Sequence, residues 1–177
     1  MNEGMWQIHA TLGGFLGYSG LSGTGLSSST SMTQLGGDVT LAVRIDDAFL
    51  FGITSDYRNI GQLSSIDSHV GNFTGTRFTP VSPTIGLRTR KYFLEIDYQF
   101  LGDFSLSNKT AGGASISYAH PQGIRIRVAH QFYHSIYAGL QYETVSFTTQ
   151  KSSQNGDISL SPSLSLWQAG INIMLVY

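Results

Sequence analysis

The feature that most restricts the fold of this chain is an alternation of apolar and polar residues along much of its length. From Trp167 to Tyr177 every odd position is apolar, whereas Gln168, Gly170 and Asn172 lie between them. Successive side chains of a β-strand point to opposite faces, so a period of two residues predicts strands with one apolar face. Helical periodicity is hard to find. We therefore expect an all-β protein, with residues 1–177 forming a single domain.

The alternating segments and the connections between them predict a barrel. Alternation occurs at 6–18, 38–45, 49–58, 81–88, 92–100, 124–132, 136–143 and 167–177. Tight turns are expected at 46–47, 89–91 and 133–135, and long loops rich in Ser, Gly, Thr and Asn at 19–36, 59–80, 102–122 and 148–161. This layout is typical of an eight-stranded antiparallel up-and-down β-barrel. Residues 114–123 also alternate. We interpret them as a hairpin of the third loop, and a wall strand is the alternative.

Two kinds of eight-stranded barrel fit this length, and alternation alone does not separate them. A soluble lipocalin-like carrier has apolar residues inside, whereas a transmembrane barrel has them outside, around a polar lumen. Only 12% of the residues are charged, against roughly 25% in an ordinary soluble domain. The sequence contains no run of about 18 apolar residues, so it predicts no transmembrane helix. The low charge favours a transmembrane β-barrel.

Aromatic residues of the apolar face form two groups, as expected for the two interfaces of a bilayer. Twelve residues separate Trp6 from Tyr18, which is about 40 Å of strand and, at a tilt near 40°, about 30 Å of membrane. Preference of aromatic residues for strands is the alternative explanation. The predicted interface residues are Trp6, Tyr18, Phe49, Tyr57, Tyr92, Tyr98, Phe132, Tyr142, Trp167 and Tyr177.

The C-terminal segment carries a resemblance to a known family. A terminal aromatic residue, Tyr177, follows apolar residues at Ile171, Ile173 and Leu175. This pattern is similar to the signature that the outer-membrane assembly machinery reads, although Phe is more common at the end. In architecture the whole chain resembles the small eight-stranded outer-membrane barrels of Gram-negative bacteria, of the OmpA/OmpX/OmpW-like type.

The resemblance implies a monomer in the bacterial outer membrane, with three tight periplasmic turns and four long extracellular loops. The expected partners are outer-membrane lipids and lipopolysaccharide, the assembly machinery through the last strand, and an extracellular ligand at the loops. The start, MNEGMW, lacks a basic region followed by an apolar one, so we expect a mature form without a signal peptide. A net charge of −1 predicts no nucleic-acid partner.

Charged residues of the polar face predict an ion-paired lumen. Pairing across the turn near His134 places Arg125 opposite Glu143, and we also expect Asp97 near Arg127 and Arg88 near Glu95. Buried charges need partners. The predicted network contains Arg44, Arg88, Glu95, Asp97, Arg125, Arg127 and Glu143.

These features lead to several hypotheses about function. We favour a plugged barrel that acts structurally, or in adhesion through its loops, because eight strands leave little interior space. A narrow pore for ions or small hydrophobic molecules, a soluble carrier and a lipid-modifying enzyme are the alternatives. We expect no enzyme, since no nucleophile and base share a suitable spacing; His134 and Ser135, for example, are adjacent and point to opposite faces. No cofactor is predicted, and no metal site.

Overall fold

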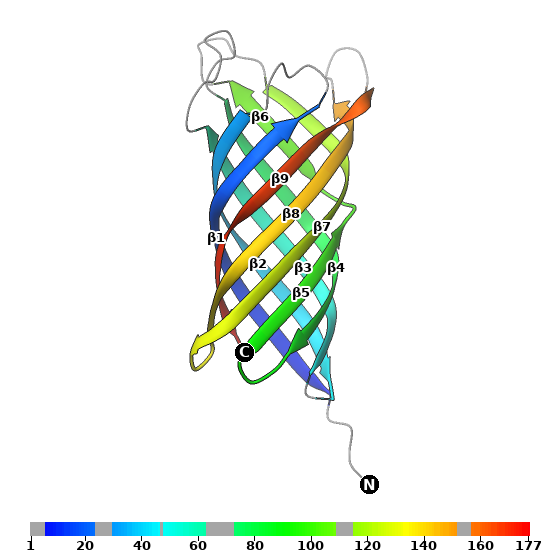
Figure 1. Ribbon diagram of the computed structural model, residues 1–177. Coiled ribbons are helices and arrows are strands. Elements are labelled where there is room, and N and C mark those ends of the chain that lie inside the picture. Colours follow the sequence, from blue (N-terminus) through cyan, green and yellow to red (C-terminus); the bar gives the residue numbers. More distant parts are fainter. Residues whose placement is uncertain (1–5, 24–29, 47, 63–72, 109–114, 152–156) are drawn as a thin grey trace.

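The computed structural model describes residues 6–23, 30–46, 48–62, 73–108, 115–151 and 157–177. It is an all-β structure whose strands wind around a single axis (Figure 1). Within the described residues no helix is long and apolar enough to cross a membrane. The strands are β1 (Gln7–Ser22), β2 (Thr30–Ile45), β3 (Phe49–Gln62), β4 (Phe73–Arg88), β5 (Tyr92–Gln99), β6 (Asp103–Asn108), β7 (Ser115–Tyr133), β8 (Ile136–Lys151) and β9 (Ile158–Val176).

The strands form a closed antiparallel wall with eight positions, which confirms the predicted up-and-down barrel. Apart from β5 and β6, which do not pair with each other, each strand pairs with its neighbours in the sequence, and β9 closes the wall by pairing with β1. β5 and β6 together occupy one position, because both lie between β4 and β7. The C-terminal segment is a wall strand as predicted, and the backbone N–H of Tyr177 donates to the carbonyl oxygen of Ala10 at 2.9 Å.

The register sets the tilt of the strands. Following the pairs once around the wall from His9 on β1 leads back to β1 at Ser19, ten residues farther along. For eight strands about 4.8 Å apart, this stagger corresponds to a tilt of about 40°. Figure 1 shows the strands inclined to the axis of the barrel. A stagger of this size brings residues from distant parts of the sequence to the same height in the lumen.

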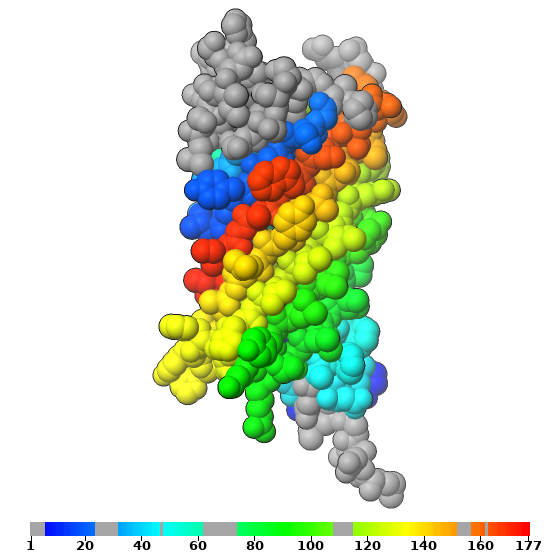
Figure 2. Space-filling view, viewed as in Figure 1, coloured from blue at the N-terminus to red at the C-terminus, as the bar shows by residue number. Residues whose placement is uncertain are grey.

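The two faces of the wall are the reverse of those in a soluble protein. Leu41 and Ile171 are 52% and 58% exposed, whereas Arg125 and Glu143 are fully buried. Figure 2 shows one side of this outer surface, where β1, β9, β8, β7 and β5 follow one another. A water-soluble carrier would need the opposite arrangement, so the lipocalin-like alternative is wrong for this fold.

All ten predicted interface residues point outward, with exposed fractions between 43% and 82%. They lie toward the two ends of the apolar surface. Eight residues separate Phe49 from Tyr57 on β3, and ten separate Trp167 on β9 from Tyr177, which directly follows this strand. At a tilt of about 40° these spacings correspond to about 20–25 Å along the axis. This height agrees better with the roughly 25 Å apolar band of outer-membrane barrels than the 30 Å predicted from Trp6 and Tyr18.

The strands extend farther than the alternation predicted, so the loops are shorter than expected. Much of the stretches assigned to loops at 19–36, 59–80, 102–122 and 148–161 belongs to the wall. The interpretation of 114–123 as a hairpin beyond the wall is wrong: Ser115 to Gly123 belong to β7 and pair with β6 and β8. The remaining parts of the long connections lie mostly outside the described residues.

Near the loops the outer surface of the wall is polar and the inner surface apolar, which explains why the strands were predicted too short. Beyond the loop-side aromatic residues the outer surface carries hydroxyl groups, such as those of Thr76, Thr144 and Ser161, which are exposed. The inner surface there is apolar, with Phe104 and Phe147 fully buried. The strands continue into a region where their outer positions are polar. An alternation with apolar outer residues therefore identifies only the part of each strand that contacts lipid.

The wall is irregular where β5 gives way to β6. Between Thr79 and Pro83 on β4 the ladder to β5 and β6 is interrupted, opposite Tyr98 to Gly102. Gly102 has a φ of +137°, which favours glycine. Pro80 and Pro83 lie on one side of the interruption and Pro121 on the other; proline has no N–H to donate to a ladder. This segment of the wall is held by fewer backbone hydrogen bonds than its surroundings.

Candidate functional site in the barrel lumen

A layer of charged side chains fills the middle of the lumen. Five carboxylates and four guanidinium groups point inward from β2, β3, β4, β5, β7 and β8, and each residue is at most 3% exposed. The register explains how they meet, because Asp97, Arg125 and Glu143 are direct neighbours across three strands. We call this set the charged layer: Asp38, Asp56, Arg58, Arg77, Glu95, Asp97, Arg125, Arg127 and Glu143.

The first chain of ion pairs is centred on Asp56. Arg125 joins Asp56 to Asp97, with Nη1 2.8 Å from Asp56 Oδ2 and Nε 2.6 Å from Asp97 Oδ2. Arg77 joins Asp56, at 3.2 Å, to Glu143. The chain Glu143–Arg77–Asp56–Arg125–Asp97 thus crosses the lumen between strands that are not neighbours in the wall.

The second chain is centred on Asp38. Arg127 Nη1 lies 2.9 Å from Asp38 Oδ1, and its Nη2 lies 3.4 Å from Glu95 Oε1. Arg58 approaches Asp38 at 3.6 Å and lies over the ring of Phe15, 4.5 Å from its centroid. Arg58 is therefore the most weakly paired arginine of the charged layer.

Threonine hydroxyl groups connect the first chain to the wall. Thr84 and Thr54 donate to Asp97 Oδ1 at 2.5 and 3.3 Å, and the hydroxyl groups of Thr54 and Thr40 lie 2.7 Å apart. Burying this many charges has a large desolvation cost, which only multiple pairing and hydrogen bonding offset. The charged layer therefore holds the strands in one relative arrangement.

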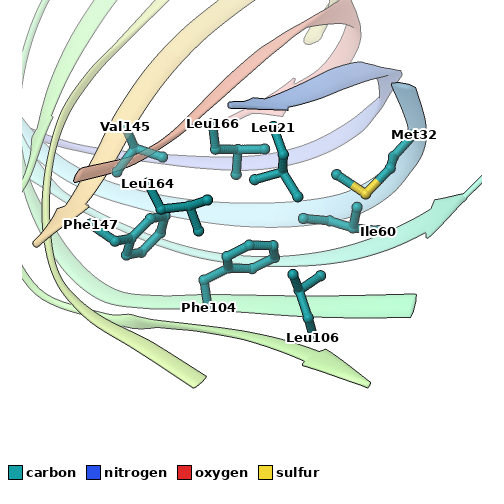
Figure 3. Close-up of a cluster of buried hydrophobic side chains, with 9 residues drawn as sticks. All are labelled: Leu21, Met32, Ile60, Phe104, Leu106, Val145, Phe147, Leu164 and Leu166. Atoms are coloured by element: carbon teal, nitrogen blue, oxygen red, sulfur yellow. The ribbon is translucent and has the colours of Figure 1, made fainter. Parts of the chain in front are cut away.

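Buried apolar side chains form a cluster on each side of the charged layer. Toward the loops, side chains of β1, β2, β3, β6, β8 and β9 converge (Figure 3), and the rings of Phe104 and Phe147 lie 5.5 Å apart. This upper cluster contains Leu21, Met32, Ile60, Phe104, Leu106, Val145, Phe147, Leu164 and Leu166. Toward the tight turns, the lower cluster contains Ala42, Leu50, Phe93, Ala129, Tyr137, Met174 and Val176.

Four glutamines lie beside the charges. Gln34, Gln99, Gln141 and Gln168 are at most 2% exposed, and their amide atoms have no hydrogen-bond partner within the part of the chain that the structure describes. Buried amides of this kind are the usual partners of buried water. The middle of the lumen is thus polar as well as ion-paired.

The structure brings together five of the seven residues of the predicted network: Glu95, Asp97, Arg125, Arg127 and Glu143. Arg44 and Arg88 lie elsewhere, at the tight-turn end. Arg88 contacts Nδ1 of His9 at 3.1 Å. The predicted pair of Arg88 with Glu95 is not formed. Arg44 donates to the side chain of Gln7.

The partners within the network also differ from the prediction. Arg125 lies opposite Glu143 in the register, but it pairs with Asp97 and Asp56. Arg127, expected near Asp97, pairs with Glu95 and Asp38. Arginine side chains are long enough to reach across the lumen, so the directly opposite residue is not their necessary partner.

Sequence reasoning missed four residues of the charged layer. Asp38, Asp56 and Arg58 occupy polar positions of the predicted strands, and that alternation could have identified them. Arg77 was hidden, because it lies in a stretch interpreted as loop and beyond the irregularity at Thr54 and Asp56.

Three of the described histidines lie in different surroundings. His9 is buried beside Thr11, His120 contacts the hydroxyl of Thr149, and His134 lies in a tight turn. Within the described residues no group of three His, Cys, Asp or Glu side chains is placed to hold a metal ion.

Solved structures share this architecture. Neisserial surface protein A has a TM-score of 0.62 at 10% identity, over 95% of this chain and 96% of that protein. Ail, the attachment invasion locus protein of Yersinia pestis, has a TM-score of 0.53 at 10% identity, over 96% and 99%. A second structure of Ail, in complex with the heparin analogue sucrose octasulfate, gives 0.50 at 12% identity, over 96% and 99%.

This chain has the fold of the small eight-stranded outer-membrane barrels. The likeness covers nearly the whole length of each chain, which confirms the fold that the resemblance implied. No protein-family model matches the sequence, and no curated protein matches it. At 10–12% identity the likeness is one of architecture.

Proposed function

We propose that this protein is an outer-membrane barrel with a closed lumen, whose role is to present its loop end outside the cell for adhesion or interaction. The single observation that carries the proposal is the distribution of side chains. Apolar residues such as Leu41 and Ile171 are exposed, and Arg125 and Glu143 are fully buried. Such a surface needs lipid, and the aromatic residues at both ends of it match a bilayer.

The length of the wall supports a role outside the membrane. Trp167 and Ile158 on β9 pair with Thr144 and Gln150 on β8. These two β8 residues are six positions apart, which is about 15 Å along the axis at a tilt of about 40°. The outer surface of this part carries exposed hydroxyl groups, such as those of Thr144 and Ser161, and the upper cluster lies in its interior. A rigid wall that rises this far above the lipid is suited to presenting loops to large partners. Of the similar structures, one is described as a surface protein and one as an attachment invasion protein.

The test begins with the membrane. Protein refolded in detergent should migrate differently on gels before and after boiling, and it should fail to fold in buffer alone. Displayed on a non-adherent Gram-negative strain, it should increase binding to cultured cells, and purified protein in micelles should compete. Folding in plain buffer, or no gain of adherence by a correctly inserted barrel, would contradict the proposal.

A narrow pore is the second candidate, and the four buried glutamines favour it. Their amides provide polar groups in the middle of the lumen, whereas the apolar side chains of the upper and lower clusters on both sides favour a closed barrel. Planar-bilayer recording distinguishes the two candidates: a closed barrel gives no steady conductance, whereas a pore gives regular single-channel steps.

A further inference from the structure

A polar cavity lies at the tight-turn end of the barrel, below the lower cluster. It has a volume of about 490 Å³ and is lined by Arg44, Arg88, Thr89, Arg90, Gln131 and Tyr137. Tyr137 is 1% exposed and belongs to the lower cluster, so the cavity is separated from the charged layer. It is large enough for a small organic ligand.

The charges of this cavity differ from those of the charged layer. Every arginine of that layer makes an ion pair with at least one carboxylate. Within the described residues, by contrast, neither Arg88 nor Arg90 makes such a pair. Arg88, which is half-buried, contacts the Nδ1 atom of His9 at 3.1 Å and lies 5.8 Å from the centroid of the Tyr137 ring.

These neighbours of Arg88 are uncharged partners. The imidazole of His9 and the phenol ring of Tyr137 carry no negative charge, so neither neutralises the arginine. A half-buried cation without a counter-charge is unfavourable. An anion that enters the cavity would supply that charge, with the bidentate geometry that arginine offers to carboxylates and phosphates.

We propose that this cavity binds an anionic ligand through a phosphate or carboxylate group held by Arg88 and Arg90, with Thr89 and Gln131 at its rim. The volume leaves room for an organic body attached to the anion. The ligand is either a soluble phosphorylated or carboxylated molecule, or the headgroup of an anionic lipid. The proposal does not depend on the role of the loop end.

The experiment uses the full chain refolded in an uncharged maltoside detergent at fixed ionic strength, because salt screens weak charge contacts. Calorimetric titration with inorganic triphosphate tests the soluble source. Mixed micelles with phosphatidylglycerol, compared with phosphatidylcholine, test the lipid source. The variants are Arg88→Gln and Arg90→Gln. Lys91→Gln is the matched control, since it removes the same charge from the same turn but does not line the cavity.

Loss of one charge-assisted hydrogen-bonding partner should weaken binding by about tenfold or more. We expect this for Arg88→Gln and Arg90→Gln, with the control within about twofold of the original protein. A loss seen only with phosphatidylglycerol assigns the anion to a lipid headgroup, and one seen with triphosphate assigns it to a soluble ligand. If Arg88→Gln fails to fold, Arg90→Gln decides, because Arg90 is exposed. Equal losses in all three variants, or no binding of either probe, would overturn the proposal.

Discussion

Replacement of Arg125 by alanine should strongly destabilise the barrel. The guanidinium group joins two buried carboxylates, at 2.8 Å from Asp56 and 2.6 Å from Asp97. Asp56 would keep Arg77 at 3.2 Å, but Asp97 would keep only the hydroxyl groups of Thr84 and Thr54. Leaving a buried charge without its partner costs about 3–5 kcal/mol, and we expect a loss of this size in the free energy of unfolding.

Three comparisons show whether pairing is the cause. Arg58→Ala should cost less, because Arg58 makes a single long contact with Asp38, at 3.6 Å, and Asp38 keeps Arg127. Lys151→Ala removes an exposed ion pair with Asp103 and should change stability by less than about 1 kcal/mol. Combining Arg125→Met with Asp97→Asn removes both charges, so it should recover part of the loss caused by Arg125→Ala.

The assay is reversible urea unfolding in lipid vesicles, followed by tryptophan fluorescence and by gel migration without boiling. The reasoning about the charged layer is refuted if Arg125→Ala costs no more than Lys151→Ala. It is also refuted if the double variant is less stable than the single one. An increase in bilayer conductance without loss of stability would mean that Arg125 gates an open lumen.

Three further predictions follow from the wall. Trp6 and Trp167 face outward, so lipids brominated near the headgroup should quench the fluorescence of the folded protein more than lipids brominated at the chain ends; no quenching would exclude the proposed membrane interfaces. A Cβ atom at Gly139 would collide with the backbone of Val128 and Ala129, whereas at Gly14 the nearest atom is 4.0 Å away. Gly139→Ala should therefore lower the unfolding free energy by about 1–3 kcal/mol and Gly14→Ala should not; equal urea midpoints would contradict this. Backbone amides of Leu101 and Gly102 should exchange with deuterium faster than those of Leu94 and Ile96, which lie in ladders on both sides; equal protection measured by NMR would show that the wall is continuous there.

The alternation of apolar and polar residues identifies the membrane part of the wall but not the part beyond it. Where the wall contacts lipid, the alternation around Leu41, Ile96 and Ile171 identified the strands and their outward faces. Beyond the loop-side aromatic residues the polarity of the two faces is reversed, with the apolar Phe147 inside and the polar Thr144 outside. The serine, threonine and glycine residues of this part are typical of loops. For this reason the wall strand at 115–123 was predicted to be a hairpin of the third loop.

The sequence by itself determined that the chain is a transmembrane-type barrel, because a two-residue period and the position of aromatic residues are local properties of each strand. Only the tertiary structure decided which charges meet. Arg77 and Glu143 come from β4 and β8, which do not pair with each other. Their contact depends on the stagger of ten residues around the wall and on the irregularity at Thr54 and Asp56, and neither is encoded by the spacing within any one strand.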